Sequence, residues 1–312
     1  MASFGLGRNI LARLFGYAAP HDLVVEREAR LMRLDSHQHF WRYNSAEYGW
    51  ITPDKARLRR DYLPADLQPL LLANGFDGSI AIQARQSLEE TEWLLSLADR
   101  YHFIKGVVGW VDLCSPDLEE QLQQVGHHPK LVGVRHVLHD ESDDEFMMRP
   151  DFRRGIGRLA DYNLTYDLLI FVKHLPAAIR LVQEFPAQRF VLDHIAKPDI
   201  RGRAISPWDQ GISRLANLPN IFCKLSGMVT EAEWLRWQPS DYLAYLNLIC
   251  SAFGTDRLMI GSDWPVCTLS SPYGATMGIV IQYLEQFPPA VRERIMGGNC
   301  ARAYGIEQRK MS

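Results

Sequence analysis

The chain has 312 residues, of which 47% are hydrophobic and 23% are charged, and its formal net charge is -3 at pH 7. This composition supplies enough apolar material for a sizeable core and excludes a disordered or fibrous protein. No run of lysine and arginine interleaved with aromatic residues provides the basic surface that nucleic acid requires, so we expect a small-molecule partner and no nucleic-acid partner.

Cysteine usage and hydropathy together favour a cytoplasmic protein. The five cysteines are scattered along the chain without a C-x-x-C pair, which is typical of reduced thiols. The longest apolar stretches have the length of strands rather than the roughly 20 residues of a membrane span. We therefore expect no contact with a membrane.

The first 32 residues are expected to form an extension that the folded domain does not need. Residues 1–20 contain two arginines and no acidic residue, and residues 9–17 can form a short amphipathic helix, which is typical of a targeting peptide. The other interpretation is a translation start upstream of the natural one at Met32. Under both, the domain covers residues 33–312.

Short apolar runs rich in β-branched residues predict eight strands. They cover residues 33–40, 78–84, 104–111, 131–137, 164–170, 189–195, 221–227 and 258–264. Several of these runs, such as the one that contains Ile80 and Ile82, lack the polar alternation of a half-solvated strand. Such runs are typical of a parallel sheet that is buried on both faces.

Segments with apolar residues at helical spacing separate most of these strands. They cover residues 88–101, 116–125, 152–162, 175–185, 242–253 and 275–287. The alternation predicts an α/β fold, namely a single-domain (β/α)8 TIM-like barrel that a helical segment at residues 289–304 closes. An open, doubly wound sheet is the alternative. No internal repeat or Gly/Ser linker marks a second domain.

The first and last predicted strands end in polar residues. His37 and His39 are two apart on the first strand, so their imidazoles point to the same side, into the mouth of the barrel. The eighth strand ends at Asp263, and because the eighth strand of a closed barrel neighbours the first, we expect this carboxylate beside the histidines. A helix N-cap is the alternative interpretation of Asp263.

Polar residues also interrupt the strands between these two. His194 ends the sixth strand, and Arg135, Asp167 and Lys224 lie in the fourth, fifth and seventh. A single polar residue in a strand commonly has a structural role, but the recurrence of such residues in neighbouring strands predicts a shared site at the mouth of the barrel.

Four motifs in this order resemble the amidohydrolase superfamily, and more narrowly its lactonase branch, the amidohydrolase-2 group that opens L-fucono- and L-rhamnono-lactones. They are DSHQHFW at residues 35–41, VLDHIAKP at 191–198, CKLSG at 223–227 and GSDWP at 261–265. The resemblance extends over nearly all of the chain from Arg33 to Tyr304.

The resemblance implies a lactonase, a hydrolase of carboxylic ester bonds in carbohydrate metabolism, with a sugar lactone as substrate. It makes His37, His39, His194 and Asp263 the catalytic residues, and we expect Asp263 to be the general base that activates water. It also implies that no cofactor is required. The lysine and histidine of binuclear sites are replaced at the fourth and fifth strands, where Arg135 and Asp167 stand. The same four catalytic residues can hold one divalent ion such as zinc.

Lactone hydrolysis also needs groups that bind the developing oxyanion and the sugar ring. We expect Arg135 and Lys224 to supply fixed positive charge, and Asp167 and Tyr166 to contact the substrate. Three tryptophans are further candidates, because their rings can stack on a sugar. They are Trp41, Trp110 and Trp264.

Two other functions remain open from the sequence. One is a metal-dependent amidohydrolase or decarboxylase on the same barrel, which metal analysis after chelation would reveal. The other is a catalytically inactive barrel that binds a ligand, which a screen of sugar lactones by proton release would exclude. The preferred lactone, its ring size and the oligomeric state are also left open.

Overall fold

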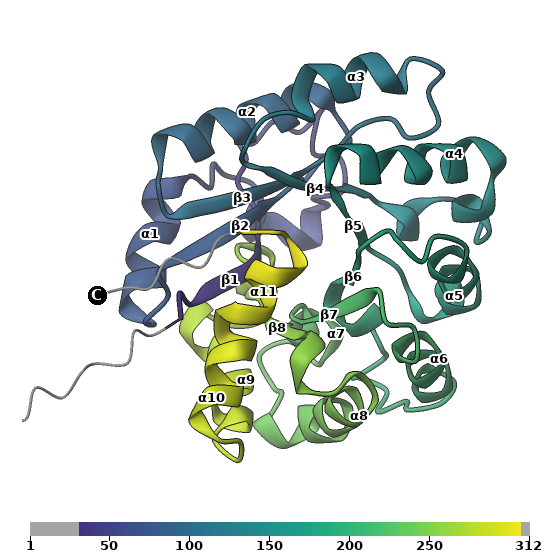
Figure 1. Ribbon diagram of the computed structural model, residues 1–312. Helices are drawn as coiled ribbons and strands as arrows, with labels where there is room; N and C mark the ends of the chain where they lie inside the picture. Colours follow the sequence, from purple (N-terminus) through teal and green to yellow (C-terminus); the bar gives the residue numbers. More distant parts are fainter. Residues whose placement is uncertain (1–30, 307–312) are drawn as a thin grey trace, which may run out of the picture.

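The computed structural model describes residues 31–306, and its eight parallel strands lie side by side in sequence order (Figure 1). They are β1 (Leu34–Gln38), β2 (Gly78–Ile82), β3 (Ile104–Gly109), β4 (Leu131–His136), β5 (Thr165–Leu168), β6 (Phe190–Leu192), β7 (Ile221–Leu225) and β8 (Leu258–Ile260). All eight lie within the strands predicted from the sequence. The strands are apolar on both sides because both faces of the sheet are covered.

Backbone hydrogen bonds beyond the last strand bring the two edges of the sheet together. The Asp263 N–H donates to the His37 carbonyl at 2.8 Å, and the His39 N–H donates to the Trp264 carbonyl at 2.7 Å. Gln38 and Trp264 form a parallel bridge at the same place. The sheet is therefore a nearly closed barrel, as predicted, and not an open doubly wound sheet.

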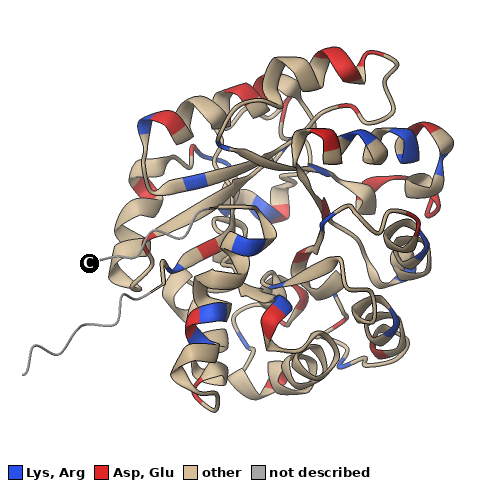
Figure 2. Cartoon of the chain, in the orientation of Figure 1, with Lys and Arg blue, Asp and Glu red and all other residues tan. Residues whose placement is uncertain are grey.

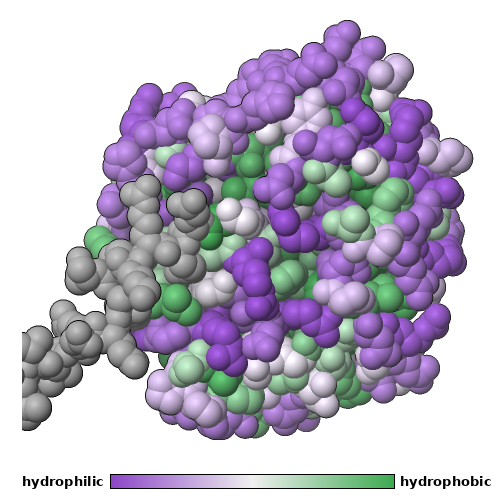
Figure 3. All heavy atoms as spheres, in the orientation of Figure 1, coloured by the Kyte–Doolittle hydropathy of each residue, from purple (hydrophilic) through white to green (hydrophobic). Residues whose placement is uncertain are grey.

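Helices surround the barrel and connect its strands (Figure 1). They are α1 (Pro64–Ala73), α2 (Leu88–Arg100), α3 (Leu118–Val125), α4 (Pro150–Leu159), α5 (Leu175–Glu184), α6 (Trp208–Ala216), α7 (Met228–Glu231), α8 (Leu243–Phe253), α9 (Tyr273–Leu284), α10 (Pro289–Glu293) and α11 (Asn299–Ala303). Basic and acidic residues are both scattered over the outer helices in Figure 2, and hydrophilic residues dominate the surface over α2 and α3 in Figure 3. No helix within residues 31–306 is both long and apolar enough to cross a bilayer.

Three helices, α1, α6 and the four-residue α7, occupy segments for which the sequence predicted none. Pro69 lies inside α1 and Gly211 inside α6, and both residue types weaken a helical pattern. Gly211 has a packing reason, because a Cβ at this position would lie 2.6 Å from Leu175 Cδ1 on α5. The glycine thus permits the close approach of two neighbouring helices.

The N-terminal end of the barrel is filled by apolar side chains and covered by α11. Thr165, the first residue of β5, donates a hydrogen bond to the Ala303 carbonyl at 2.8 Å. Met32 and Tyr304 belong to the apolar cluster at this end, and Met32 is only 6% exposed. The folded domain therefore includes Met32, which the sequence had assigned to the extension. Residues 1–30 lie outside the described part of the chain.

Candidate active site

Three imidazoles surround one carboxylate oxygen at the C-terminal end of the barrel. Asp263 Oδ1 lies 3.3 Å from His39 Nε2, 3.7 Å from His37 Nε2 and 3.9 Å from His194 Nε2. The Nε2 atoms of His37 and His39 are 3.1 Å apart. The closure of the barrel thus unites residues from β1, from the end of β6 and from the end of β8.

The backbone turns sharply where β6 and β8 end. Residues 194–197 all have positive φ angles between 49° and 61°, and Asp263 has a φ of 56°. Residues other than glycine rarely adopt this backbone conformation, and each instance costs roughly 1–3 kcal/mol. Gly227 also has a positive φ, and a Cβ there would lie 2.4 Å from His194 Nδ1. This glycine therefore makes room for the His194 ring.

The electrostatic surroundings keep Asp263 ionised, and burial keeps His37 and His194 neutral. Burial alone would raise the pKa of Asp263, but His194, His39 and Lys197 outweigh burial, so this pKa is below its usual value. Burial lowers the pKa of His37 and of His194 well below the usual value. A carboxylate that is ionised at neutral pH can take a proton from water, as a general base must.

Three charged residues and a tyrosine lie beneath the three histidines and Asp263. We call this group the floor cluster, and it consists of Lys224, Asp167, Asp193 and Tyr304. Lys224 Nζ donates to Asp167 Oδ2 at 2.6 Å and lies 2.9 Å from Asp193 Oδ1. The Tyr304 hydroxyl donates to both oxygens of Asp167. Burial would lower the pKa of Lys224, but Asp167 and Asp193 raise it above its usual value, so the ammonium stays charged.

Arg135 connects the floor cluster to the site above. Its Nη1 donates to Asp193 Oδ2 at 3.0 Å and lies 3.4 Å from His37 Nε2. Its Nε and Nη2 donate to the Gln83 side chain, and Nη2 also donates to the Gln83 carbonyl. Arginine has five N–H donors. These bonds use four of them, and the fifth, on Nη1, faces His37 Nε2.

A cavity of about 300 Å³ opens above Asp263. Four of the predicted residues line it, namely His39, His194, Asp263 and Arg135. The sequence did not single out the other lining residues, which include Trp50, Lys55, His139, Asp140, Lys197, Thr230, Glu231 and Trp234. Most of them lie in loops or short helical turns, where no periodic pattern marks them. Lys197 did stand in a quoted motif, and it forms an ion pair with Glu231 at 2.8 Å.

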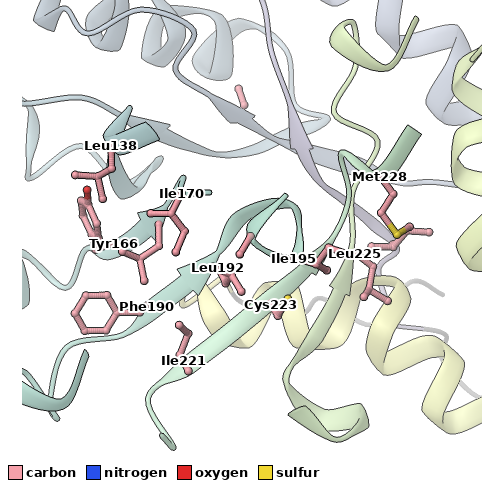
Figure 4. Packing of buried hydrophobic residues seen from close by; sticks show 14 of the residues in the cluster. Leu138, Tyr166, Ile170, Phe190, Leu192, Ile195, Ile221, Cys223, Leu225 and Met228 are labelled. Carbon is pink, nitrogen blue, oxygen red and sulfur yellow. The ribbon is translucent and has the colours of Figure 1, made fainter. Parts of the chain in front are cut away.

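The remaining predicted residues do not line this cavity. Lys224 and Asp167 are fully buried in the floor cluster. Tyr166 is fully buried too and packs near Phe190, as Figure 4 shows, so it belongs to the core. These three residues therefore lie outside the cavity lining, and their predicted contact with the substrate stays a prediction.

The three predicted tryptophans also have structural surroundings. Trp41 is fully buried, and its Nε1–H donates to the Arg60 carbonyl at 2.9 Å. Trp264 is 2% exposed and lies edge-on to Phe40. Trp110 donates from Nε1 to His136. None of the three lines the cavity above Asp263, and their role as stacking platforms for a sugar ring stays a prediction.

Three of the four predicted donors lie close enough together to hold one metal ion. A tetrahedral zinc ion with bonds of about 2.0–2.2 Å separates its ligand atoms by roughly 3.3–3.6 Å. The donor atoms of His37, His39 and Asp263 lie 3.1–3.7 Å apart, close to these separations, whereas His194 Nε2 lies 3.9 Å from Asp263 and belongs to a second group with His37 and Asp193. Imidazole nitrogen and carboxylate oxygen are also ligands that zinc accepts.

The barrel and this constellation define an amidohydrolase. Residues 34–306 match the amidohydrolase family model, so the chain belongs to the amidohydrolase family. The resemblance seen in the motifs is thereby confirmed.

Two relatives and one solved structure are similar over nearly the whole chain. An L-fucono-1,5-lactonase of Burkholderia multivorans is 41% identical over 89% of this chain and 97% of its own length. An L-fucono-1,5-lactonase of Burkholderia ambifaria is 37% identical over 88% of this chain and 96% of its own length. A crystal structure of a Burkholderia multivorans amidohydrolase with bound zinc is 42% identical over 88% of this chain and all of that chain, with a TM-score of 0.85.

Proposed function

We propose that the protein hydrolyses a sugar-acid lactone of the L-fucono-1,5-lactone type, with Asp263 as the general base. The observation that carries the proposal is the Asp263 carboxylate, which lines the cavity and is surrounded by three imidazoles at 3.3–3.9 Å. The likeness to two L-fucono-1,5-lactonases over nearly their whole length supports the choice of substrate class.

The reaction can be written with the residues that line the cavity. The Asp263 carboxylate takes a proton from water, and the hydroxide attacks the lactone carbonyl. The Nη1–H of Arg135 beside His37 donates to the developing oxyanion. When the tetrahedral intermediate collapses, the ring oxygen leaves and takes the proton back from Asp263. One lactone and one water thus give one hydroxy acid, and the carboxylate is restored.

The size and lining of the cavity suit a single sugar ring. A volume of about 300 Å³ lies at the lower end of small-molecule sites. Trp50 and Trp234 offer aromatic faces to the ring, while Lys55, Asp140 and Thr230 can bond its hydroxyl groups. Polar residues on several sides of the cavity favour a polyhydroxylated substrate over an apolar ester.

We further propose that the reaction does not require a metal ion. His37, His39, His194 and Asp263 would hold such an ion, which would polarise the lactone carbonyl or acidify water. A lactone is an activated ester, however, and Arg135 already brings a permanent positive charge to the cavity. The base and the oxyanion donor are therefore both present among the side chains.

A screen of aldonolactones with a pH indicator tests this function, because each hydrolysed lactone releases one proton at neutral pH. L-Fucono-1,5-lactone and L-rhamnono-lactones should be hydrolysed well above the spontaneous rate, and D-configured lactones serve as the comparison. The Asp263→Asn variant is the matched control. Wild-type protein that accelerates none of these lactones would reject the proposal in favour of another amidohydrolase reaction or an inactive barrel.

A further inference from the structure

The Lys224 ammonium group has three acceptors at hydrogen-bond distance. They are Asp167 Oδ2 at 2.6 Å, Asp193 Oδ1 at 2.9 Å and His37 Nδ1 at 3.2 Å. A lysine ammonium has three N–H donors and no acceptor. The ammonium can thus donate to Asp167 and to His37 while it holds Asp193 as an ion pair, provided that His37 Nδ1 carries a lone pair rather than a proton.

The contacts on the other side of the His37 ring agree with this assignment. A neutral imidazole with a lone pair on Nδ1 carries its proton on Nε2. The nearest acceptor for this Nε2–H is His39 Nε2, at 3.1 Å. His39 Nδ1 in turn donates to the Ile82 carbonyl at 2.9 Å, which leaves its Nε2 free to accept. The N–H donors of His37 and His39 therefore each meet an acceptor.

The opposite tautomer of His37 would create two repulsive contacts. Its Nδ1–H would face the Lys224 ammonium at 3.2 Å, and its Nε2 lone pair would face that of His39 at 3.1 Å. In return it would gain only longer contacts of 3.4 Å, to Asp193 Oδ1 and to Arg135 Nη1. Hydrogen bonds weaken with distance, so these contacts do not compensate.

We propose that Lys224 is a positioning residue that fixes His37 as the Nε2–H tautomer in the metal-free protein. The ring nitrogen that points toward Asp263 is then protonated and unavailable as a metal ligand. Zinc can bind His37 Nε2 only after the proton moves to Nδ1 and the hydrogen bond from Lys224 is lost. Lys224 thus makes metal binding unfavourable from beneath the site, without touching the ion.

The same tautomer has a consequence for Arg135, and here the inference rests on the proposed lactone hydrolysis. Because His37 Nε2 is a donor in this arrangement, it cannot accept from Arg135 Nη1, which is 3.4 Å away. The remaining Nη1–H of Arg135 is therefore free to bind the lactone oxyanion. The buried lysine would support a catalytic site that uses arginine rather than a metal.

Nitrogen NMR of the wild-type protein tests the tautomer directly. Metal-free protein with 15N in the histidine rings should show His37 with a protonated Nε2 and an unprotonated Nδ1, assigned by the loss of this signal in His37→Gln. Neutron diffraction of metal-free crystals, which locates hydrogen atoms, gives the same answer without a variant. A proton on Nδ1 would overturn the proposal, whether or not the protein hydrolyses any lactone.

A double variant tests the role of Lys224. Lys224→Met combined with Asp167→Asn removes the cation and one carboxylate, so the formal charge of the floor cluster stays the same. His37 should then donate from Nδ1 to Asp193, and zinc alone should bind about tenfold more tightly, the lower end of the range for residues that support metal ligands. The matched control is Asp167→Asn, which keeps Lys224 and should keep the wild-type tautomer and zinc affinity within about threefold.

The outcomes of the double variant decide between a positioning role and a merely structural one. An unchanged Nε2–H tautomer together with unchanged zinc affinity would overturn the role of Lys224. If the double variant does not fold, the NMR and neutron results on the wild-type protein still decide the tautomer.

Discussion

Asp263 and Asp167 are both buried carboxylates inside one barrel, but their partners differ. Asp167 receives hydrogen bonds from Lys224 and from Tyr304, and it has no access to the cavity. Asp263 lines the cavity and has only imidazoles around its Oδ1, at 3.3–3.9 Å. Asp167 therefore uses its hydrogen-bonding capacity inside the floor cluster, whereas Asp263 keeps capacity for a substrate.

The largest effect should come from Asp263→Asn. An amide cannot take a proton from water at neutral pH, so kcat should fall about 100-fold or more, which is the usual contribution of a general base to the rate. Steady-state kinetics gives the value, and circular dichroism should show an unchanged fold. A loss smaller than about tenfold would contradict the general-base role.

Glu90 extends the comparison to a carboxylate that no cation contacts at hydrogen-bond distance. Burial raises the pKa of Glu90 to about 7, despite hydrogen bonds from the backbone N–H groups of Arg85 and Ala84 and from Tyr48. The folded state therefore holds the proton more tightly than the unfolded chain. This contribution to stability is present below pH 4.5 and is lost as the pH rises through about 7.

The variant that isolates this contribution is Glu90→Gln, which keeps an oxygen for the backbone donors and does not titrate. Relative to the variant, the wild type should lose about 3 kcal/mol of unfolding free energy between pH 4.5 and 7.5. Urea unfolding at several pH values measures this difference. Parallel pH profiles for the two proteins would show that Glu90 is not the titrating group.

The same chemical change in the floor cluster, Asp167→Asn, should affect stability rather than catalysis. Lys224 loses one of its two carboxylate partners, so the unfolding free energy should fall by about 1–3 kcal/mol. Because Asp167 does not reach the cavity, kcat should stay within about threefold of the wild type. A loss of kcat as large as that of Asp263→Asn would remove the distinction between the floor cluster and the residues that line the cavity.

Removal of metal should change activity by less than about twofold, because the base and the oxyanion donor are side chains. The measurement is lactone hydrolysis by protein whose metal content has been shown to be negligible, with and without added zinc or manganese. A collapse of activity that zinc restores would make His37, His39, His194 and Asp263 an essential metal site.

The smallest effect should come from deletion of residues 1–31, which leaves Met32 in place at the closed end of the barrel. Activity and melting temperature should stay close to those of the full chain, because the first strand begins at Leu34. A further deletion of Met32 should lower the melting temperature, since this side chain is 6% exposed and packs in the core. An insoluble or inactive shorter chain would show that the extension belongs to the domain.

Patterns in the sequence were sufficient for the barrel and for the residues around Asp263. The eight strands were predictable because their apolar runs are short and continuous, and the site because polar residues end those runs. The predicted strands extend past the true ones, since the residues that follow β6 and β8 leave the sheet with positive φ angles. No sequence pattern marks that change of direction.

Tertiary structure alone decided which polar residues reach the cavity. Arg135 and Lys224 are each a single cation in an apolar strand, yet Arg135 lines the cavity and Lys224 lies beneath it. The depth of a side chain in a barrel depends on the stagger of all eight strands, which no single segment encodes. For the same reason the tryptophans beside the motifs were assigned to the substrate, whereas Trp50 and Trp234, on connecting loops, line the cavity.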